Sequence, residues 1–199
     1  MQFRRRVLTR LVPVVVFLAA SFVPAAVSDG MAAQGRGQVY LLRGLANVFS
    51  LGMDQLGRKL EKEGIAARTM NHAHWRRIAD EITEDYRGKR TLGPVAIVGH
   101  SIGATAATLL TARLADNGVP VALLVAYDPS FEVTVSRNVR RAVGFHTSSF
   151  PGLKAGTGFR GSLENIPVKS SGVNHITIDK AGPVHERTIA EIKRAFGRR

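Results

Sequence analysis

A serine in a glycine-flanked motif, Gly99-His100-Ser101-Ile102-Gly103, is the residue best suited to chemistry in this chain. It lies between a β-branched apolar run at 95–98 and a stretch of small and helix-forming residues at 102–115. In the pattern G-x-S-x-G the glycines permit a tight strand-to-helix turn that raises the hydroxyl above the sheet edge. The helix then points its free N–H groups at the oxygen of the carbonyl group that the serine attacks. Three fixed residues are a weak motif, but this context favours a nucleophile over a plain Gly-Ser turn.

A serine nucleophile needs a base to take its proton, and the base needs an orienting acid. Asp128 is the candidate acid because it follows the strand expected at 121–127, and active sites of open α/β sheets lie at the carboxyl ends of strands. Asp116 and Glu164 are expected at the wrong edge of the sheet. Glu132 stays open as the alternative acid, and an Asp-Pro turn opener is the other role open to Asp128.

One of the six histidines is the favoured base. His175 lies in a loop between the last expected strand and the last expected helix, with a satisfied loop histidine as its alternative role. His100 adjoins the serine, and we expect its side chain to point away from the hydroxyl in a structural role. His72 and His74 form a His-x-His pair with no third ligand nearby, so the sequence predicts neither a metal site nor a cofactor.

Short apolar runs alternate with amphipathic segments along the chain, which predicts the elements that must position these residues. Strands are expected at 39–42, 65–70, 95–98 and 121–127, with weaker candidates at 142–147 and 163–168, and helices at 54–63, 74–86, 102–115 and 186–196. Such alternation predicts an α/β fold: a doubly wound, mostly parallel sheet of about six strands with helices on both faces.

These features resemble the α/β-hydrolase superfamily, close to its small thioesterase- and lipase-like serine hydrolases. The resemblance covers roughly residues 37–197. It rests on the Gly44-Leu45 loop after the first core strand, the serine motif, Asp128-Pro129 and Asn174-His175-Ile176.

The resemblance implies roles for four residues. His175 is the base, because an α/β-hydrolase places its histidine in this loop. Asp128 holds it, which requires a carboxylate oxygen within about 3.2 Å of the imidazole. The N–H groups of Ile102 and Leu45 form the oxyanion hole. Arg43 departs from the pattern, since many members carry histidine before this glycine; the backbone donor stays, but the usual side-chain anchor of the loop is lost.

The acid also departs from the commoner family pattern, because it follows the strand immediately after the nucleophile strand.

With 199 residues the chain has room for one well-buried domain and none for a large lid domain. Residues 148–161 are either a mobile flap over the acyl pocket or a plain connecting loop, and both interpretations stay open.

The first residues are typical of a secretory signal: basic residues, an apolar stretch at 11–27, then small residues suited to cleavage. We therefore assign 1–33 to a signal peptide or N-terminal anchor and 34–199 to the hydrolase domain. The expected location is periplasmic or secreted, with membrane anchoring through an uncleaved segment as one alternative. A cytosolic protein that starts at Met31 is another.

The formal net charge of +13 predicts attraction to anionic surfaces, including membranes. The basic residues show no aromatic-interleaved stripe, so specific nucleic-acid binding is not expected. The absence of cysteine excludes disulfides and a thiolate nucleophile.

The leading functional hypothesis is a serine hydrolase that cleaves a small-molecule carboxylic ester or thioester through an acyl-enzyme. The alternative is a non-catalytic hydrolase-fold protein of the cell envelope that binds an acyl ligand or a protein partner.

Overall fold

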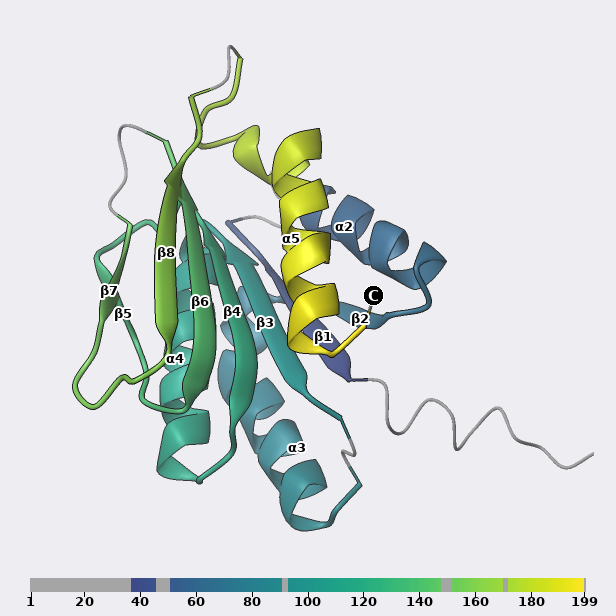
Figure 1. The fold of residues 1–199 in the computed structure, drawn as a ribbon, viewed down its shortest axis with the longest axis vertical. Helices are drawn as coiled ribbons and strands as arrows, with labels where there is room; N and C mark the ends of the chain where they lie inside the picture. The colour runs from purple at the N-terminus through teal and green to yellow at the C-terminus, as the bar shows by residue number, and fades with distance from the viewer. Residues whose placement is uncertain (1–36, 46–50, 91–92, 148–151, 170–171, 199) are drawn as a thin grey trace, which may run out of the picture.

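A six-stranded parallel sheet forms the centre of the molecule, as the computed structural model shows for residues 37–45, 51–90, 93–147, 152–169 and 172–198 (Figure 1). The strand order is β2-β1-β3-β4-β6-β8, and each neighbouring pair is parallel. The strands are β1 (Gln38–Arg43), β2 (Ala66–Asn71), β3 (Val95–His100), β4 (Val121–Tyr127), β6 (Val139–His146) and β8 (Ser162–Pro167). This confirms the expected doubly wound α/β fold.

Helices cover both faces of the sheet. On one face lie α2 (Leu51–Lys62) and α5 (Gly182–Ala195), and on the other lie α3 (Trp75–Arg87) and α4 (Ile102–Asp116) (Figure 1). Two single-turn 3-10 helices, η1 (His72–His74) and η2 (Ile178–Lys180), precede α3 and α5. Successive residues of a strand point to opposite faces, so β3 sends Ile97 into one core and Val98 into the other.

The central strands are apolar along their whole length because both of their faces are covered. Every residue of β3 and of β4 is buried. This is the pattern of a parallel sheet enclosed by helices, and it explains why these two runs are the most strand-like in the sequence.

Residues 148–161 were expected to be a flap or a plain loop, but the central part of this region is a strand. Leu153–Ala155 forms β7, which pairs in parallel with β5 (Val133–Val135) as a separate two-stranded sheet. The side-chain amide of Asn165 on β8 completes this corner: its Oδ1 accepts from the N–H of Leu153 at 2.8 Å and its Nδ2 donates to the carbonyl of Leu153 at 2.9 Å. Residues 148–151 lie outside the described residues.

The predicted signal or anchor at 1–33 also lies outside the described residues. Within the part of the chain that the structure describes, none of the helices has the length and apolar character needed to span a bilayer.

Candidate active site

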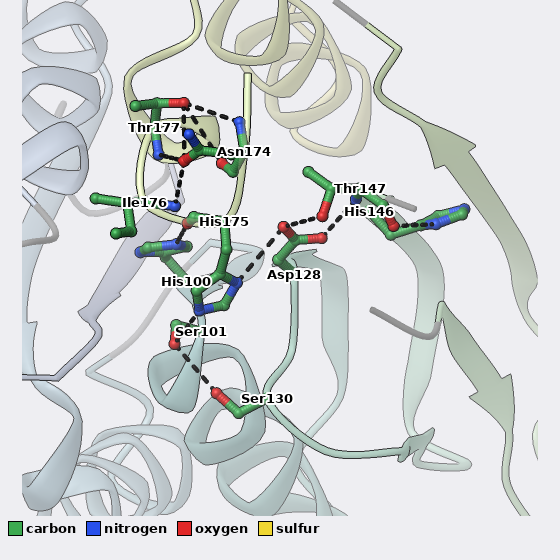
Figure 2. Close-up of polar contacts among 10 residues, drawn as sticks. All are labelled: His100, Ser101, Asp128, Ser130, His146, Thr147, Asn174, His175, Ile176 and Thr177. Carbon is green, nitrogen blue, oxygen red and sulfur yellow. Dashed lines mark hydrogen bonds and ion pairs between the residues drawn. The ribbon is translucent and has the colours of Figure 1, made fainter. Parts of the chain in front are cut away.

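Ser101 lies in a strained turn between β3 and α4, with φ 58° and ψ −126°. Both glycines of the motif are required by close packing around it. A Cβ at Gly99 would lie 2.3 Å from the carbonyl oxygen of Gly103, and a Cβ at Gly103 would lie 2.4 Å from the carbonyl oxygen of Leu42 on β1. The start of α4 therefore packs directly on the sheet, and the turn presents the serine hydroxyl at the carboxyl edge (Figure 2).

His175 meets this hydroxyl from the loop before η2. Its Nε2 lies 2.9 Å from Ser101 Oγ (Figure 2). Asn174 shapes the loop locally, because its side-chain Oδ1 accepts from the backbone N–H of Ile176 at 2.9 Å and of Thr177 at 3.2 Å. This Asx-type turn fixes the backbone on which the imidazole stands.

His100, the residue before Ser101, contacts the backbone of the same loop. Its Nε2 lies 2.8 Å from the carbonyl oxygen of His175, and a carbonyl can only accept, so Nε2 carries the hydrogen. Burial lowers the pKa of His100 to about 4, which keeps the ring neutral at ordinary pH. The expected structural role thus takes a specific form: His100 positions the backbone of His175.

Asp128 follows β4, is fully buried and has a φ of 41°. Its carboxylate accepts from the N–H of Thr147 at 2.6 Å and from the hydroxyl of Thr147 at 2.8 Å. The second oxygen lies 3.5 Å from Nδ1 of His175 (Figure 2). Asp128 thus faces the imidazole nitrogen opposite the serine as expected, although the separation exceeds the predicted hydrogen-bond distance of about 3.2 Å.

The two expected oxyanion donors lie on adjoining segments. Ile102 is the first residue of α4, where N–H groups have no partner within the helix, and Leu45 follows β1. Arg43, the departure from the family pattern before Gly44, forms a two-point ion pair with Asp54 on α2, with N–O distances of 2.9 and 2.5 Å. That contact holds the pKa of the Asp54 carboxyl below its ordinary value. Arg43 therefore anchors the end of β1 to α2.

Comparison with known proteins agrees with this geometry. The sequence model of the family described as thioesterase domain matches residues 43–147, more than half of the chain. The chain belongs to the thioesterase domain family. Membership places it among hydrolases of the α/β superfamily, as the sequence resemblance implied. No curated protein matches the chain.

Solved structures of similar fold support the architecture. Est1E from Butyrivibrio proteoclasticus is 13% identical with a TM-score of 0.50, over 80% of this chain and 89% of that one. A protein of Xanthomonas campestris pv. campestris assigned to the alpha/beta hydrolase superfamily is 15% identical with a TM-score of 0.50, over 80% of this chain and 97% of that one. At these identities the likeness concerns the fold alone.

The other acids considered for this thioesterase-family site lie elsewhere. Glu132, the open alternative, forms an ion pair with Lys154 on β7 at 2.5 Å. Asp116 ends α4 and lies 3.8 Å from Arg137. Glu164 on β8 pairs with Arg141 and with an arginine of α5. Of the four candidates, Asp128 is therefore the acid whose carboxylate faces His175.

The structure also brings in two residues that sequence reasoning missed. Ser130 places its Oγ 3.1 Å from Ser101 Oγ, and Thr147 holds the carboxylate of Asp128 (Figure 2). The hydroxyl that follows Asp128-Pro129 is a signal that could have drawn attention to Ser130. Thr147 follows β6, and nothing in its local sequence distinguishes it.

His72, the first residue of the His-x-His pair with His74, contacts the backbone at the end of β1. Nδ1 of His72 lies 3.1 Å from the carbonyl oxygen of Arg43, where it supports the end of β1. Among the residues that the structure describes, no group of three or more His, Asp or Glu side chains is arranged to hold a metal ion.

Proposed function

We propose that this thioesterase-family chain hydrolyses an acyl thioester through an acyl-enzyme formed on Ser101. The observation that carries the proposal is the 2.9 Å contact between Ser101 Oγ and His175 Nε2, at a strained strand-to-helix turn. Membership of the thioesterase family supports the thioester as the substrate class. Carboxylic esters are accessible to the same groups, since both reactions pass through the same acyl-enzyme.

In the first half-reaction Ser101 Oγ attacks the acyl carbon while its proton passes to His175 Nε2. The carbonyl electron pair moves to oxygen, and the N–H groups of Ile102 and Leu45 stabilise the resulting oxyanion. Collapse of this intermediate breaks the C–S bond and releases the thiolate, which can take the proton from the imidazolium.

In the second half-reaction a water molecule attacks the acyl-enzyme. His175 accepts a proton from the water and then returns it to the departing Ser101 oxygen, which frees the carboxylic acid. Asp128 faces Nδ1 of His175, where its negative charge favours the tautomer with the hydrogen on Nδ1 and offsets the charge of the imidazolium.

Exposed apolar side chains adjoin the proposed catalytic residues in the sequence. Ile176 follows His175, Phe131 follows Ser130, and Leu45 is itself one of the two expected oxyanion donors; all three side chains are more than half exposed. Exposed apolar surface of this kind suits binding of an apolar acyl group. The basic character of the chain would draw the protein to anionic surfaces. A periplasmic or secreted location is proposed from the signal-like pattern of residues 1–33.

Labelling with a fluorophosphonate tests the proposal, because this probe reacts with activated serines. The wild type should be labelled and should hydrolyse short acyl thioesters, whereas Ser101→Ala should do neither and should keep its thermal midpoint. The matched control is Ser136→Ala, because Ser136 is also a half-buried serine with a hydroxyl contact, 3.4 Å from Thr111 Oγ1. Turnover that survives in Ser101→Ala would refute the serine mechanism, and a wild type that is neither labelled nor active would favour the non-catalytic alternative.

A further inference from the structure

We propose that Ser130 donates a hydrogen bond to Ser101 Oγ and stabilises the negative charge that this oxygen carries in both half-reactions. The inference rests on the proposed acyl-enzyme mechanism and adds a group to it. Its starting observation is the 3.1 Å distance between the two hydroxyl oxygens, with Ser130 approaching from a different element than His175 (Figure 2).

Counting hydrogens fixes the direction of this bond. The buried, negatively charged carboxylate of Asp128 lies 3.5 Å from Nδ1 of His175, and its charge favours the tautomer with the hydrogen on Nδ1. Nε2 then offers a lone pair, and Ser101 gives it the single hydrogen of its hydroxyl across 2.9 Å. Ser101 has no second hydrogen to offer, so the bond between the two hydroxyls must be donated by Ser130.

The turn that carries the acid also sets the place of Ser130. Asp128 has a φ of 41° and is held through its carboxylate by Thr147, and Pro129 is buried and fixes its own φ. Ser130 follows directly and is itself only partly exposed. One short segment after β4 thereby delivers two polar groups to the site: the acid behind the imidazole and a hydroxyl beside the nucleophile.

A donor at this position acts whenever Ser101 Oγ is charged. During acylation the O–H bond of Ser101 breaks as the bond from Oγ to carbon forms, and the proton goes to His175. During deacylation the bond from carbon to Oγ breaks, its electron pair goes to Oγ, and the proton returns from His175. Ser130 keeps its own proton in both steps, and its hydrogen bond strengthens as charge develops on Oγ.

The two half-reactions depend on this donor to different degrees. A thiolate is a good leaving group, whereas the Ser101 alkoxide that must leave in deacylation is a poor one. Ser130→Ala should therefore lower kcat for an acyl thioester about tenfold, with a smaller loss in kcat/KM because the acyl-enzyme accumulates and KM falls. Labelling by a fluorophosphonate, which requires attack by Ser101, should also slow.

The experiment compares wild type, Ser130→Ala, Ser130→Thr and Ser136→Ala by steady-state turnover, labelling rate and thermal midpoint. Ser130→Thr keeps a hydroxyl and should recover most of the lost kcat, and Ser136→Ala should behave as wild type in all three measurements. Equal kcat and KM in wild type and Ser130→Ala would overturn the inference while leaving the acyl-enzyme mechanism intact. The inference would also be overturned if Ser130→Ala lowered kcat with an unchanged KM and Ser130→Thr failed to recover it. A wild type that neither turns over nor is labelled would refute the acyl-enzyme mechanism itself.

Discussion

Ser101 and Asp128 both hold their backbones in the left-handed region, with φ values of 58° and 41°. Side chains with a Cβ rarely adopt this conformation, and it costs on the order of 1–3 kcal/mol per residue. The surrounding contacts fix it in each case: glycines and the start of α4 enclose Ser101, and Thr147 binds the carboxylate of Asp128. Of the three non-glycine residues with positive φ in the described ranges, Lys89 lies elsewhere and the other two lie in the turns that project the proposed nucleophile and its acid.

Asp128→Asn tests the acid at the level of one functional group. Asparagine keeps an oxygen for the N–H of Thr147 but places an N–H₂ group where a carboxylate oxygen faced His175. That donor favours the imidazole tautomer with its hydrogen on Nε2, and it cannot offset the imidazolium charge. We expect kcat to fall by on the order of 10⁴ with the protein still folded, measured by thioester turnover and circular dichroism.

Glu132→Gln serves as the control for this change. Glu132 pairs with Lys154 at a surface position, so its substitution should leave kcat nearly unchanged. The opposite result, a small effect at Asp128 and a large one at Glu132, would show that another acid orients the imidazole.

The candidate site illustrates what a sequence can predict about single residues. Ser101 was identifiable because its glycines are demanded by packing, and Asp128 because it ends a buried strand. His175 required the family resemblance, since its loop carries no periodic pattern. Ser130, Thr147 and the contact of His100 with the carbonyl of His175 depend on how distant loops meet, and sequence spacing does not encode that.

At the level of elements, α2 connects the two loops that converge on Ser101. Asp54 on its first turn pairs with Arg43 at the end of β1. Gly52, also in that turn, donates its N–H at 2.9 Å to the buried carboxylate of Asp179 on η2, four residues after His175. A Cβ at Gly52 would lie 1.9 Å from the carbonyl oxygen of Asp179, so the contact between α2 and η2 leaves no room for a side chain.

The buried carboxyl of Asp179 makes this contact sensitive to pH. Burial raises its pKa from 3.8 to about 6, against the opposing effects of the Gly52 N–H and Lys180. The folded state therefore binds more protons than the unfolded chain between about pH 4 and pH 6. The stability that this proton contributes is complete below about pH 4 and is lost as the pH rises through about 6.

Asp179→Asn is expected to remove this dependence, because asparagine stays neutral at every pH. Its thermal midpoint should match that of the wild type below about pH 4 and exceed it near pH 7.5, as measured by differential scanning calorimetry. Asp116→Asn, at an exposed position, provides the matched control. Parallel midpoints for Asp179→Asn and wild type across this range would contradict the assignment.

The elements themselves were predictable where burial imposes a clear pattern. The six main strands and four helices were expected from apolar runs and amphipathic spacing, although α5 begins at Gly182, four residues before its predicted start. The strands β5 and β7 were missed because each has only three residues. The side chain of Asn165 binds the backbone of Leu153 on β7, a contact across twelve residues that no local pattern reveals.

At the level of the whole molecule, we propose that the N-terminal segment directs the protein to its location. If residues 1–33 are a cleaved signal, mass spectrometry of the protein isolated from its native cell should show an N-terminus between about residues 25 and 34. An intact Met1 in the membrane fraction would indicate a retained anchor instead. A chain that begins at Met31 and fractionates with the cytosol would contradict secretion.

The parallel sheet also gives the molecule two unlike ends. The chain enters β1 beside Pro94, whose carbonyl accepts from the N–H of Gln38, whereas Ser101 lies where β3 ends. Six residues of strand separate these edges by about 20 Å. The described chain therefore begins at the edge of the sheet opposite Ser101, so that anything attached ahead of β1 joins the sheet at the end remote from the proposed nucleophile and leaves the serine edge open to thioesters from the aqueous phase.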